Sequence, residues 1–184
     1  NNKNLKLNEL SKSSAAHNVL IIDDNSSCKF KKNSNYELEI KNGLKIIKKK
    51  IIYEKNYWKI VAAHDGYLKK YKSIYEREIE FYPENNKFIG IDKIIGKKTI
   101  PNLKFDIRFH LDPKTKTMKT QDGKSILIEI ENEGWKFTCD NYEIDIDNGL
   151  YFGKKNMCTE NQNIFISGII SSRNNDIKWE LTKI

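Results

Sequence analysis

The three histidines are the side chains of this sequence best suited to proton transfer or metal binding near neutral pH. His17 stands in SSAAHNVLIID, directly before the first apolar run, and His64 stands in VAAHDGY, directly after another apolar run. Both therefore lie at expected strand ends, where side chains from several strands meet at the rim of a sheet. His110 lies within an alternating run, on its polar side. A structural role stays open for each of them, because single histidines at such positions are more often hydrogen-bonded than catalytic.

The other reactive side chains follow no pattern of a known catalytic or metal site. The sequence lacks a nucleophile elbow, a Walker loop, a dinucleotide fingerprint and an HExxH helix. Cys28, Cys139 and Cys158 are too scattered for a disulfide framework or a zinc knuckle, and we expect small buried side chains. We interpret the acidic stretch 140–148 as a strand and turn, because a calcium loop needs a denser oxygen cluster. The aromatic residues within 53–75 could stack on sugars, although aromatic residues in strands usually fill a core or pair across strands.

Alternation of apolar and polar residues with a period of two dominates the chain after residue 14. The longest run is 103–111, in which Leu, Phe and Ile alternate with Lys, Asp, Arg and His. Such a run is typical of a strand with one buried and one solvated face. Asn-Gly, Asp-Gly and Glu-Gly pairs separate the runs, at a spacing typical of a sandwich or barrel. We therefore predict an all-β fold, an antiparallel β-sandwich of roughly a dozen strands that is incomplete at its N-terminal side if earlier strands lie upstream.

Two segments depart from this pattern. Residues 1–14 are polar without a sustained period, so we expect a tail or a cut linker before one domain over residues 15–184. Residues 66–73 are the best candidate for a helix, although a short one. If upstream strands of the same sandwich are missing, we also expect an uncovered sheet edge or face and a tendency to aggregate.

The charge balance restricts the classes of binding partner. The 184 residues include 33 Lys and Arg against 25 Asp and Glu, a net charge of +8, and only Arg77, Arg108 and Arg173 are arginine. Proteins that read nucleic acids rely on the bidentate arginine fork, so the composition argues against a nucleic-acid-binding barrel. A solvated lysine-rich surface and attraction to another acidic polymer both stay open. No run approaches a membrane span and no signal peptide is visible; since the first residue is Asn, we expect a processed chain or a piece of a longer protein.

Two segments resemble motifs of the heparinase II/III family. Segment 13–23, SSAAHNVLIID, resembles the family signature ST-x-A-H-N-T, with Val19 where Thr is usual. Segment 61–81, VAAHDGYLKKYKSIYEREIEF, resembles a stretch A-x-H-D-G-Y that is followed by H-x-R. Tyr75 stands where His is frequent, and Arg77 matches the arginine of that motif.

Later segments extend the resemblance in the same order. Segment 103–113, LKFDIRFHLDP, is similar to a family strand with R-F-H-L-x-P, and segments 164–168 and 177–181 are similar to its closing strands. The resemblance thus covers roughly residues 13–183. It implies the C-terminal β-sandwich domain of an enzyme whose N-terminal part is an α/α toroid.

The family consists of polysaccharide lyases that cleave uronic-acid-containing chains, such as heparin, heparan sulfate or alginate, by β-elimination. This reaction needs a neutralised carboxylate at C5, a base for the C5 proton and an acid for the leaving oxygen. The resemblance implies that most of these groups, including a Tyr, come from the toroid. We therefore assign no catalytic residue, leave the substrate-binding residues unknown and expect the chain alone to be inactive. The implied partners are an acidic polysaccharide and the upstream toroid, and the implied location is the bacterial periplasm or cell envelope.

The resemblance also implies a zinc site in the full-length protein, held by two His and an Asp. Only His17 matches one of these positions, so it is our metal-ligand candidate, and the other two ligands precede the His-Asn motif. Because a closed zinc site has about four ligands, we expect no cofactor for the 184 residues alone. For His64 and Asp65 no ligand or catalytic role is carried over, since a reverse turn at Asp65-Gly66 is the plainer explanation. The alternative to a lyase domain is a stand-alone glycan-binding β-sandwich.

Overall fold

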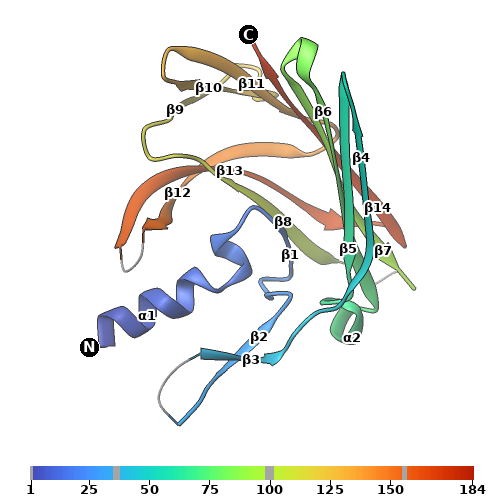
Figure 1. Cartoon of the computed structure of the whole chain (residues 1–184), viewed down its shortest axis with the longest axis vertical. Helices are drawn as coiled ribbons and strands as arrows, with labels where there is room; N and C mark the ends of the chain where they lie inside the picture. The colour runs from blue at the N-terminus through green and yellow to red at the C-terminus, as the bar shows by residue number, and fades with distance from the viewer. Residues whose placement is uncertain (1, 35–37, 98–101, 155–156) are drawn as a thin grey trace.

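The computed structural model describes residues 2–34, 38–97, 102–154 and 157–184. Within these ranges the chain forms fourteen strands, arranged as two antiparallel sheets that pack against each other and a separate hairpin (Figure 1). This arrangement confirms the predicted all-β sandwich. In the part of the chain that the structure describes, no helix is long and apolar enough to cross a membrane.

The larger sheet has eight strands and curves around the smaller sheet (Figure 1). In sheet order, the strands are β4 (Ile46–Glu54), β5 (Tyr57–His64), β6 (Ser73–Tyr82), β7 (Lys87–Gly96), β14 (Asn174–Lys183), β11 (Glu133–Cys139), β10 (Ser125–Ile130) and β9 (Lys116–Lys119). Strands β4 to β7 are neighbours in the same order as in the sequence. The C-terminal strand β14 lies between β7 and β11, so it joins the two halves of this sheet.

The smaller sheet has four strands, and the remaining elements are short. In sheet order, its strands are β1 (Leu20–Ile22), β8 (Leu103–His110), β13 (Met157–Ile170) and β12 (Glu143–Lys154). The separate hairpin and the helices are β2 (Lys29–Lys32), β3 (Leu38–Asn42), α1 (Asn2–Ser11), η1 (Ser14–Ala16), α2 (Leu68–Tyr71) and η2 (Pro83–Asn85). Helix α2 lies within residues 66–73, where the sequence predicts a short helix.

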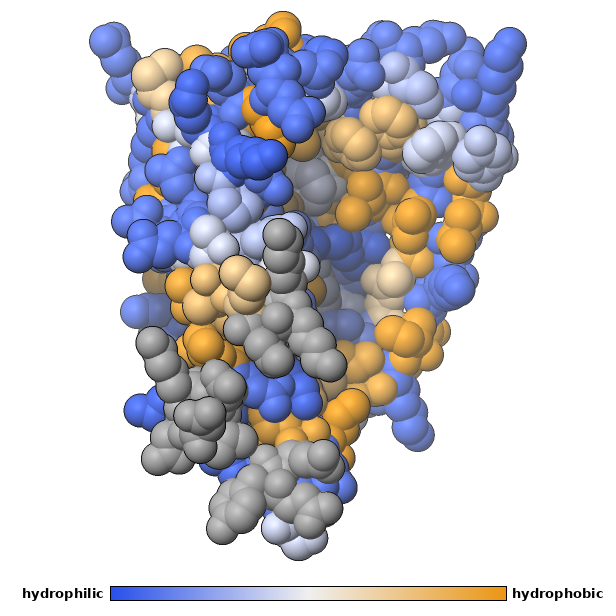
Figure 2. All heavy atoms as spheres, turned by 60° about the vertical axis from the view of Figure 1, so that its left-hand side comes forward, coloured by the Kyte–Doolittle hydropathy of each residue, from blue (hydrophilic) through white to orange (hydrophobic). Residues whose placement is uncertain are grey.

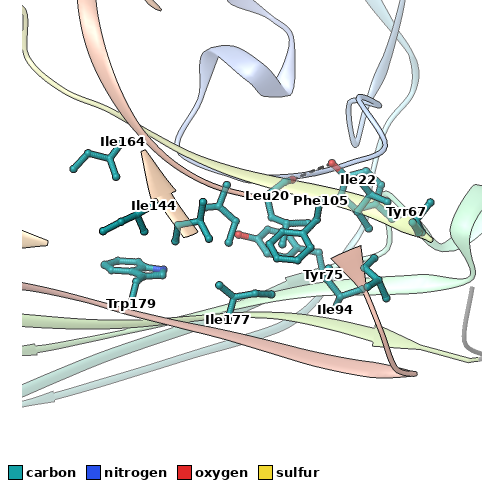
Figure 3. Packing of buried hydrophobic residues seen from close by; sticks show 14 of the residues in the cluster. Leu20, Ile22, Tyr67, Tyr75, Ile94, Phe105, Ile144, Ile164, Ile177 and Trp179 are labelled. Carbon is teal, nitrogen blue, oxygen red and sulfur yellow. Dashed lines mark hydrogen bonds between the residues drawn. The ribbon is translucent and has the colours of Figure 1, made fainter. Parts of the chain in front are cut away.

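The core lies between the two sheets, where the alternating runs place their apolar faces. From the smaller sheet, Phe105 and Ile107 on β8 are 1% and 0% exposed. From the larger sheet, Tyr75, Ile177 and Trp179 are also buried, and Figure 3 shows several of these side chains lying together. Each such side chain contributes roughly 1.5–3 kcal/mol through removal of apolar surface from water. The period-two pattern therefore fixes which face of each strand is buried.

The N-terminal residues differ from the tail or linker that we expected for 1–14. Residues Asn2–Ser11 form helix α1, and Figure 1 shows this helix at the same end of the molecule as the β2–β3 hairpin. The ammonium group of Lys32 lies 2.6 Å from the Glu9 carboxylate, and that of Lys12 donates to the backbone oxygen of Leu38 at 3.3 Å. These contacts to the hairpin hold the segment in place. They connect residues far apart in sequence, which local periodicity does not predict.

Candidate functional site around His17 and His110

Three segments that are far apart in the sequence meet around the turn between η1 and β1. The guanidinium of Arg77 on β6 donates a hydrogen bond to the backbone oxygen of Asn18. The Asn18 Oδ1 accepts a hydrogen bond from the backbone N–H of His110 at 2.7 Å, and the His110 Nε2 lies 2.9 Å from the backbone oxygen of Ala15. The segments that contain His17, Arg77 and His110 therefore form one cluster, which we call the His17–His110 cluster.

A buried ion pair fixes the position of Arg77. Its Nε and Nη2 donate to the two carboxylate oxygens of Asp92 on β7, at 2.7 and 3.0 Å. The Asp92 side chain is fully buried. Bidentate hydrogen bonds between an arginine and a carboxylate are among the strongest hydrogen bonds in proteins. Burial lowers the pKa of Arg77 and the Asp92 charge raises it, with a net upward shift, so the guanidinium stays charged. Because its donors engage Asp92 and Asn18, Arg77 positions the His17–Asn18 turn.

Asp92 accepts two further hydrogen bonds from the core. The Trp179 Nε1 donates at 2.8 Å, and the Tyr75 hydroxyl donates to the other carboxylate oxygen. Burial and the Asp92 charge raise the pKa of Tyr75 well above its ordinary value, so this hydroxyl stays protonated and does not act as a base at neutral pH. The sequence motif indicates Arg77 and the neighbouring Tyr75 but not their partner Asp92. The available signal was a single aspartate within the otherwise apolar stretch 88–92.

His110 is held as a neutral ring. Because a backbone carbonyl only accepts hydrogen bonds, the contact with Ala15 requires the proton on Nε2, which leaves Nδ1 as an acceptor. Burial lowers the pKa of His110, and the charges of Arg108 and His17 act in the same direction. Its Nδ1 is buried without a hydrogen-bond partner among the described residues. His17, by contrast, is exposed, so a ligand can reach its imidazole.

His64 and Asp65 form a turn whose contacts are structural. The backbone N–H of Gly66 donates to the His64 Nδ1 at 3.2 Å, and the Asp65 Oδ1 accepts from the backbone N–H of Lys45 at 2.7 Å. A Cβ on Gly66 would lie 2.7 Å from the backbone oxygen of Ser27, so this close approach requires glycine. These contacts support the reverse turn expected at this position.

The His17–His110 cluster does not complete a metal site by itself. Its two imidazoles supply at most two ligands, whereas zinc usually takes four. Across the described ranges, no group of three or more His, Cys, Asp or Glu side chains is placed to hold a metal ion. His17 as a zinc ligand therefore stays a prediction, and it requires further ligands from outside these residues.

The cysteines and the acidic stretch show no reactive arrangement. All three cysteines are free and half-buried. Burial and the neighbouring Asp140 charge raise the pKa of Cys139 to about 12, so this thiol is not a nucleophile at neutral pH. In the acidic stretch, the exposed Asp145 lies 3.4 Å from the ammonium group of Lys119, and Asp147 lies 3.1 Å from the guanidinium of Arg108. The strand interpretation of this stretch agrees with its place in β12.

A row of aromatic rings crosses β4 to β7 on the inner face of the larger sheet. Ring centroids are 5.4 Å apart for Tyr53 and Trp58, 5.1 Å for Trp58 and Phe81, and 4.3 Å for Phe81 and Phe88. Exposure rises toward the sheet edge and reaches 41% for Trp58 and 76% for Tyr53. Figure 2 shows apolar side chains beside a hollow on this side of the molecule. The exposed rings thus lie on a part of the inner face that the smaller sheet does not cover.

The fold and the converging segments define an antiparallel β-sandwich domain in which distant segments of the chain meet at one site. The profile of the family described as heparinase II/III-like, C-terminal, matches residues 2–180. The chain therefore belongs to this family.

Solved structures of the same kind share the fold. Heparan sulfate lyase HepC from Pedobacter heparinus superposes with a TM-score of 0.74 at 11% identity, over 97% of this chain and 26% of that chain. Two heparinase III structures give TM-scores of 0.70 and 0.64 at 11% and 13% identity, each over 97% of this chain and 25% of theirs. The chain thus spans about a quarter of the length of these structures. None of the curated proteins compared with the chain matches it.

Proposed function

We propose that this chain is the C-terminal β-sandwich domain of a polysaccharide lyase that cleaves uronic-acid-containing polysaccharides by β-elimination. The observation that carries the proposal is the His17–His110 cluster. Three segments that resemble family motifs meet there through hydrogen bonds to Asn18 and Ala15.

The role that we assign to the domain is to form one wall of the substrate cleft. β-Elimination needs a cation or hydrogen-bond donors for the uronate, a base and an acid. The cluster offers one exposed side chain for catalysis, the imidazole of His17. The guanidinium of Arg77 is already engaged by Asp92, and His110 is half-buried. This set is too small for the whole reaction. The remaining groups belong to an upstream helical toroid in our proposal, and the 184 residues alone are inactive.

The uncovered aromatic row supports packing against that upstream domain. Exposed apolar patches on soluble proteins commonly mark contact surfaces. Besides Tyr53 and Trp58, the exposed side chains on this inner face include Ile51 and Ile60, which are 60% and 51% exposed. Because the solved structures are about four times longer than the matched region, there is a large domain in those proteins outside the sandwich. We propose that a toroid of this kind covers the row.

Mixing separately produced domains tests the packing. The upstream part of the same reading frame should encode a helical domain that binds the 184-residue chain, measured by analytical ultracentrifugation. The double variant Tyr53→Ser/Trp58→Ser should weaken that complex. A control outside the row is Tyr151→Ser, at an exposed tyrosine on β12, and it is compared with the single variant Tyr53→Ser. A reading frame without a helical domain, or equal effects of Tyr53→Ser and Tyr151→Ser, would contradict the proposal.

The alternative function is a stand-alone glycan-binding module, and the exposed rings of the aromatic row favour it. Planar rings such as Trp58 and Tyr53 present flat apolar surface on which sugar rings can stack. This alternative requires the 184-residue chain alone to bind a neutral or acidic glycan, with a loss on Trp58→Ser. Under the lyase proposal the chain acts inside a longer enzyme, which we place in the bacterial periplasm or cell envelope.

A further inference from the structure

A second region of the sandwich, away from the His17–His110 cluster, has the charge and shape of a binding site. A groove of about 650 Å³ lies beside α2, the hairpin end at Asn42 and the segment that precedes β2. Its lining shares no residue with the cluster. The charged side chains that line it are Lys29, Lys69, Lys70, Lys72, Lys97 and Asp65. We call it the lysine groove.

The lysine groove holds much of the excess positive charge of the chain. Five lysines face one carboxylate there, which accounts for four of the eight net positive charges of the protein. The carboxylate of Asp65 already accepts a hydrogen bond from the backbone N–H of Lys45. In a concave site, charges of one sign reinforce each other and attract anions more strongly than they do on a flat surface.

Among the described residues, the lysines of the groove lack the acidic partners that several lysines have on the outer face of the larger sheet. On the outer face of the larger sheet, Lys59 pairs with Glu78 and Glu80, and the ammonium group of Lys93 lies 3.5 Å from a Glu76 oxygen. Within the described residues, none of the five groove lysines forms an ion pair, and all five are exposed. The ammonium groups of Lys70 and Lys72 donate to neutral oxygens, the Asn25 Oδ1 at 2.8 Å and the Lys69 backbone oxygen at 3.3 Å, so no carboxylate in the described residues neutralises these charges.

The floor of the groove is rigid. Tyr67 is 2% exposed, and its hydroxyl donates to the backbone oxygens of Leu20 and Asn25 at 3.0 and 3.1 Å (Figure 3 shows Tyr67 among the core residues). The backbone N–H of Lys97 donates to the backbone oxygen of Lys72 at 2.9 Å, which keeps these two lysines side by side. Lys72 also has a φ of 52°, a conformation that costs a residue with a side chain about 1–2 kcal/mol. A preorganised site loses little entropy when it binds a ligand.

We propose that the lysine groove binds an anionic segment of a glycan, outside the cleft that the His17–His110 cluster helps to form. Lysine ammonium groups are point charges that accept carboxylate or sulfate groups in many orientations. The neutral polar side chains of the lining, among them Ser26, Ser27 and Asn42, suit sugar hydroxyl groups. The volume of the groove, about 650 Å³, lies within the range that is usual for small-molecule binding sites. The choice of a glycan over another anion rests on the proposed function, whereas the groove itself rests on its geometry and charge.

Titration calorimetry on the 184-residue chain tests the proposal with a size-defined heparin oligosaccharide as the probe, in about 50 mM salt. The double variant Lys70→Gln/Lys72→Gln should bind about tenfold more weakly, since each exposed ion pair contributes a fraction of a kcal/mol to about 1 kcal/mol. The control Lys55→Gln/Lys114→Gln removes the same charge from two exposed turn lysines outside the groove and should change the affinity less than about twofold. Lys70→Arg/Lys72→Arg should keep the binding.

Three results would overturn the proposal. They are absence of heparin binding by the unchanged chain, equal losses in the groove and control variants, and equal affinity for a DNA oligonucleotide of matched charge. A polyuronate oligosaccharide and a neutral one complete the series: binding of the polyuronate extends the ligand class to carboxylates, and equal binding of the neutral sugar contradicts a role of charge. Failure of the lyase proposal has a separate signature, the lack of an unsaturated product from the longer protein. The two failures are therefore distinguishable.

Discussion

Replacing Asp92 by Asn removes the buried charge that organises the His17–His110 cluster while it keeps the size of the side chain. The carboxylate accepts hydrogen bonds from Tyr75, from two nitrogens of Arg77 and from Trp179. An Asn side chain offers only one oxygen, and its NH₂ group would face the N–H donors of Arg77 or Trp179. Arg77 would then be a buried cation without its counter-ion.

The expected loss of stability is large. Removing one member of a buried ion pair costs about 3–5 kcal/mol, because the other charge stays buried without compensation. The hydrogen bonds that Trp179 and Tyr75 lose are part of this cost. In a chain of this length each kcal/mol lowers Tm by about 2–4 °C, so we expect Asp92→Asn to lower Tm by about 6–20 °C.

Urea unfolding of the two proteins measures this difference in free energy by linear extrapolation. The control is Asp147→Asn, which breaks an ion pair with Arg108 at a side chain that is 49% exposed, and it should cost less than about 1 kcal/mol. Hydrogen exchange gives a second readout: the amides of His17 and Val19, which donate to the backbone oxygens of Ser14 and His17, should exchange faster in Asp92→Asn but not in the control, since Arg77 no longer holds this turn. An Asp92→Asn protein within about 1 kcal/mol of the unchanged chain would refute the reasoning.

Three further predictions concern packing, the uncovered face and pH. Gly90→Ala places a methyl group against the Trp179 ring, so urea unfolding should show a loss of about 1–3 kcal/mol, and an unchanged midpoint would contradict this. Tyr53→Ser should change the free energy of unfolding by less than about 1 kcal/mol because the ring is 76% exposed, but it should reduce binding of an apolar fluorescent dye; unaltered dye binding would argue against an accessible patch. Burial lowers the pKa of His110 in the folded state. On acidification the unfolded state therefore binds this proton at a higher pH than the folded state does. The contribution to the free energy of unfolding is complete above the unfolded-state pKa of about 6.5 and is lost as the pH drops below it. His110→Gln should therefore show a shallower decline of unfolding free energy on acidification, and parallel curves for the two proteins would exclude this contribution.

The strands were predictable because their signal is local. Leu103, Phe105 and Ile107 alternate with polar residues, and all three are buried on one face of β8. The same reasoning gives the outward direction of Asp145 and Asp147 on β12, which are exposed. In these runs the chemistry of each side chain determines which face of the strand is buried, whatever strand lies beside it.

The cluster could be predicted only in part, because its contacts depend on which strands are neighbours. The sequence motifs indicate His17 and Arg77, yet the partner Asp92 follows from the pairing of β6 with β7, in which Arg77 lies opposite Asp92. Trp179 reaches the same carboxylate because β14 joins the sheet on the other side of β7. Helix α1 was missed for a similar reason, since contacts to the distant β2–β3 hairpin hold it.

The most direct test of the proposed lyase domain is the product of the reaction. The longer protein that we propose, with its upstream domain, is incubated with heparan sulfate, heparin and alginate, and the ultraviolet absorbance of unsaturated uronate is followed. We predict that absorbance rises with at least one of these polysaccharides and that the 184-residue chain alone gives no rise. Absence of product from the longer protein on all three polysaccharides, or product formation by the 184-residue chain alone, would contradict the account.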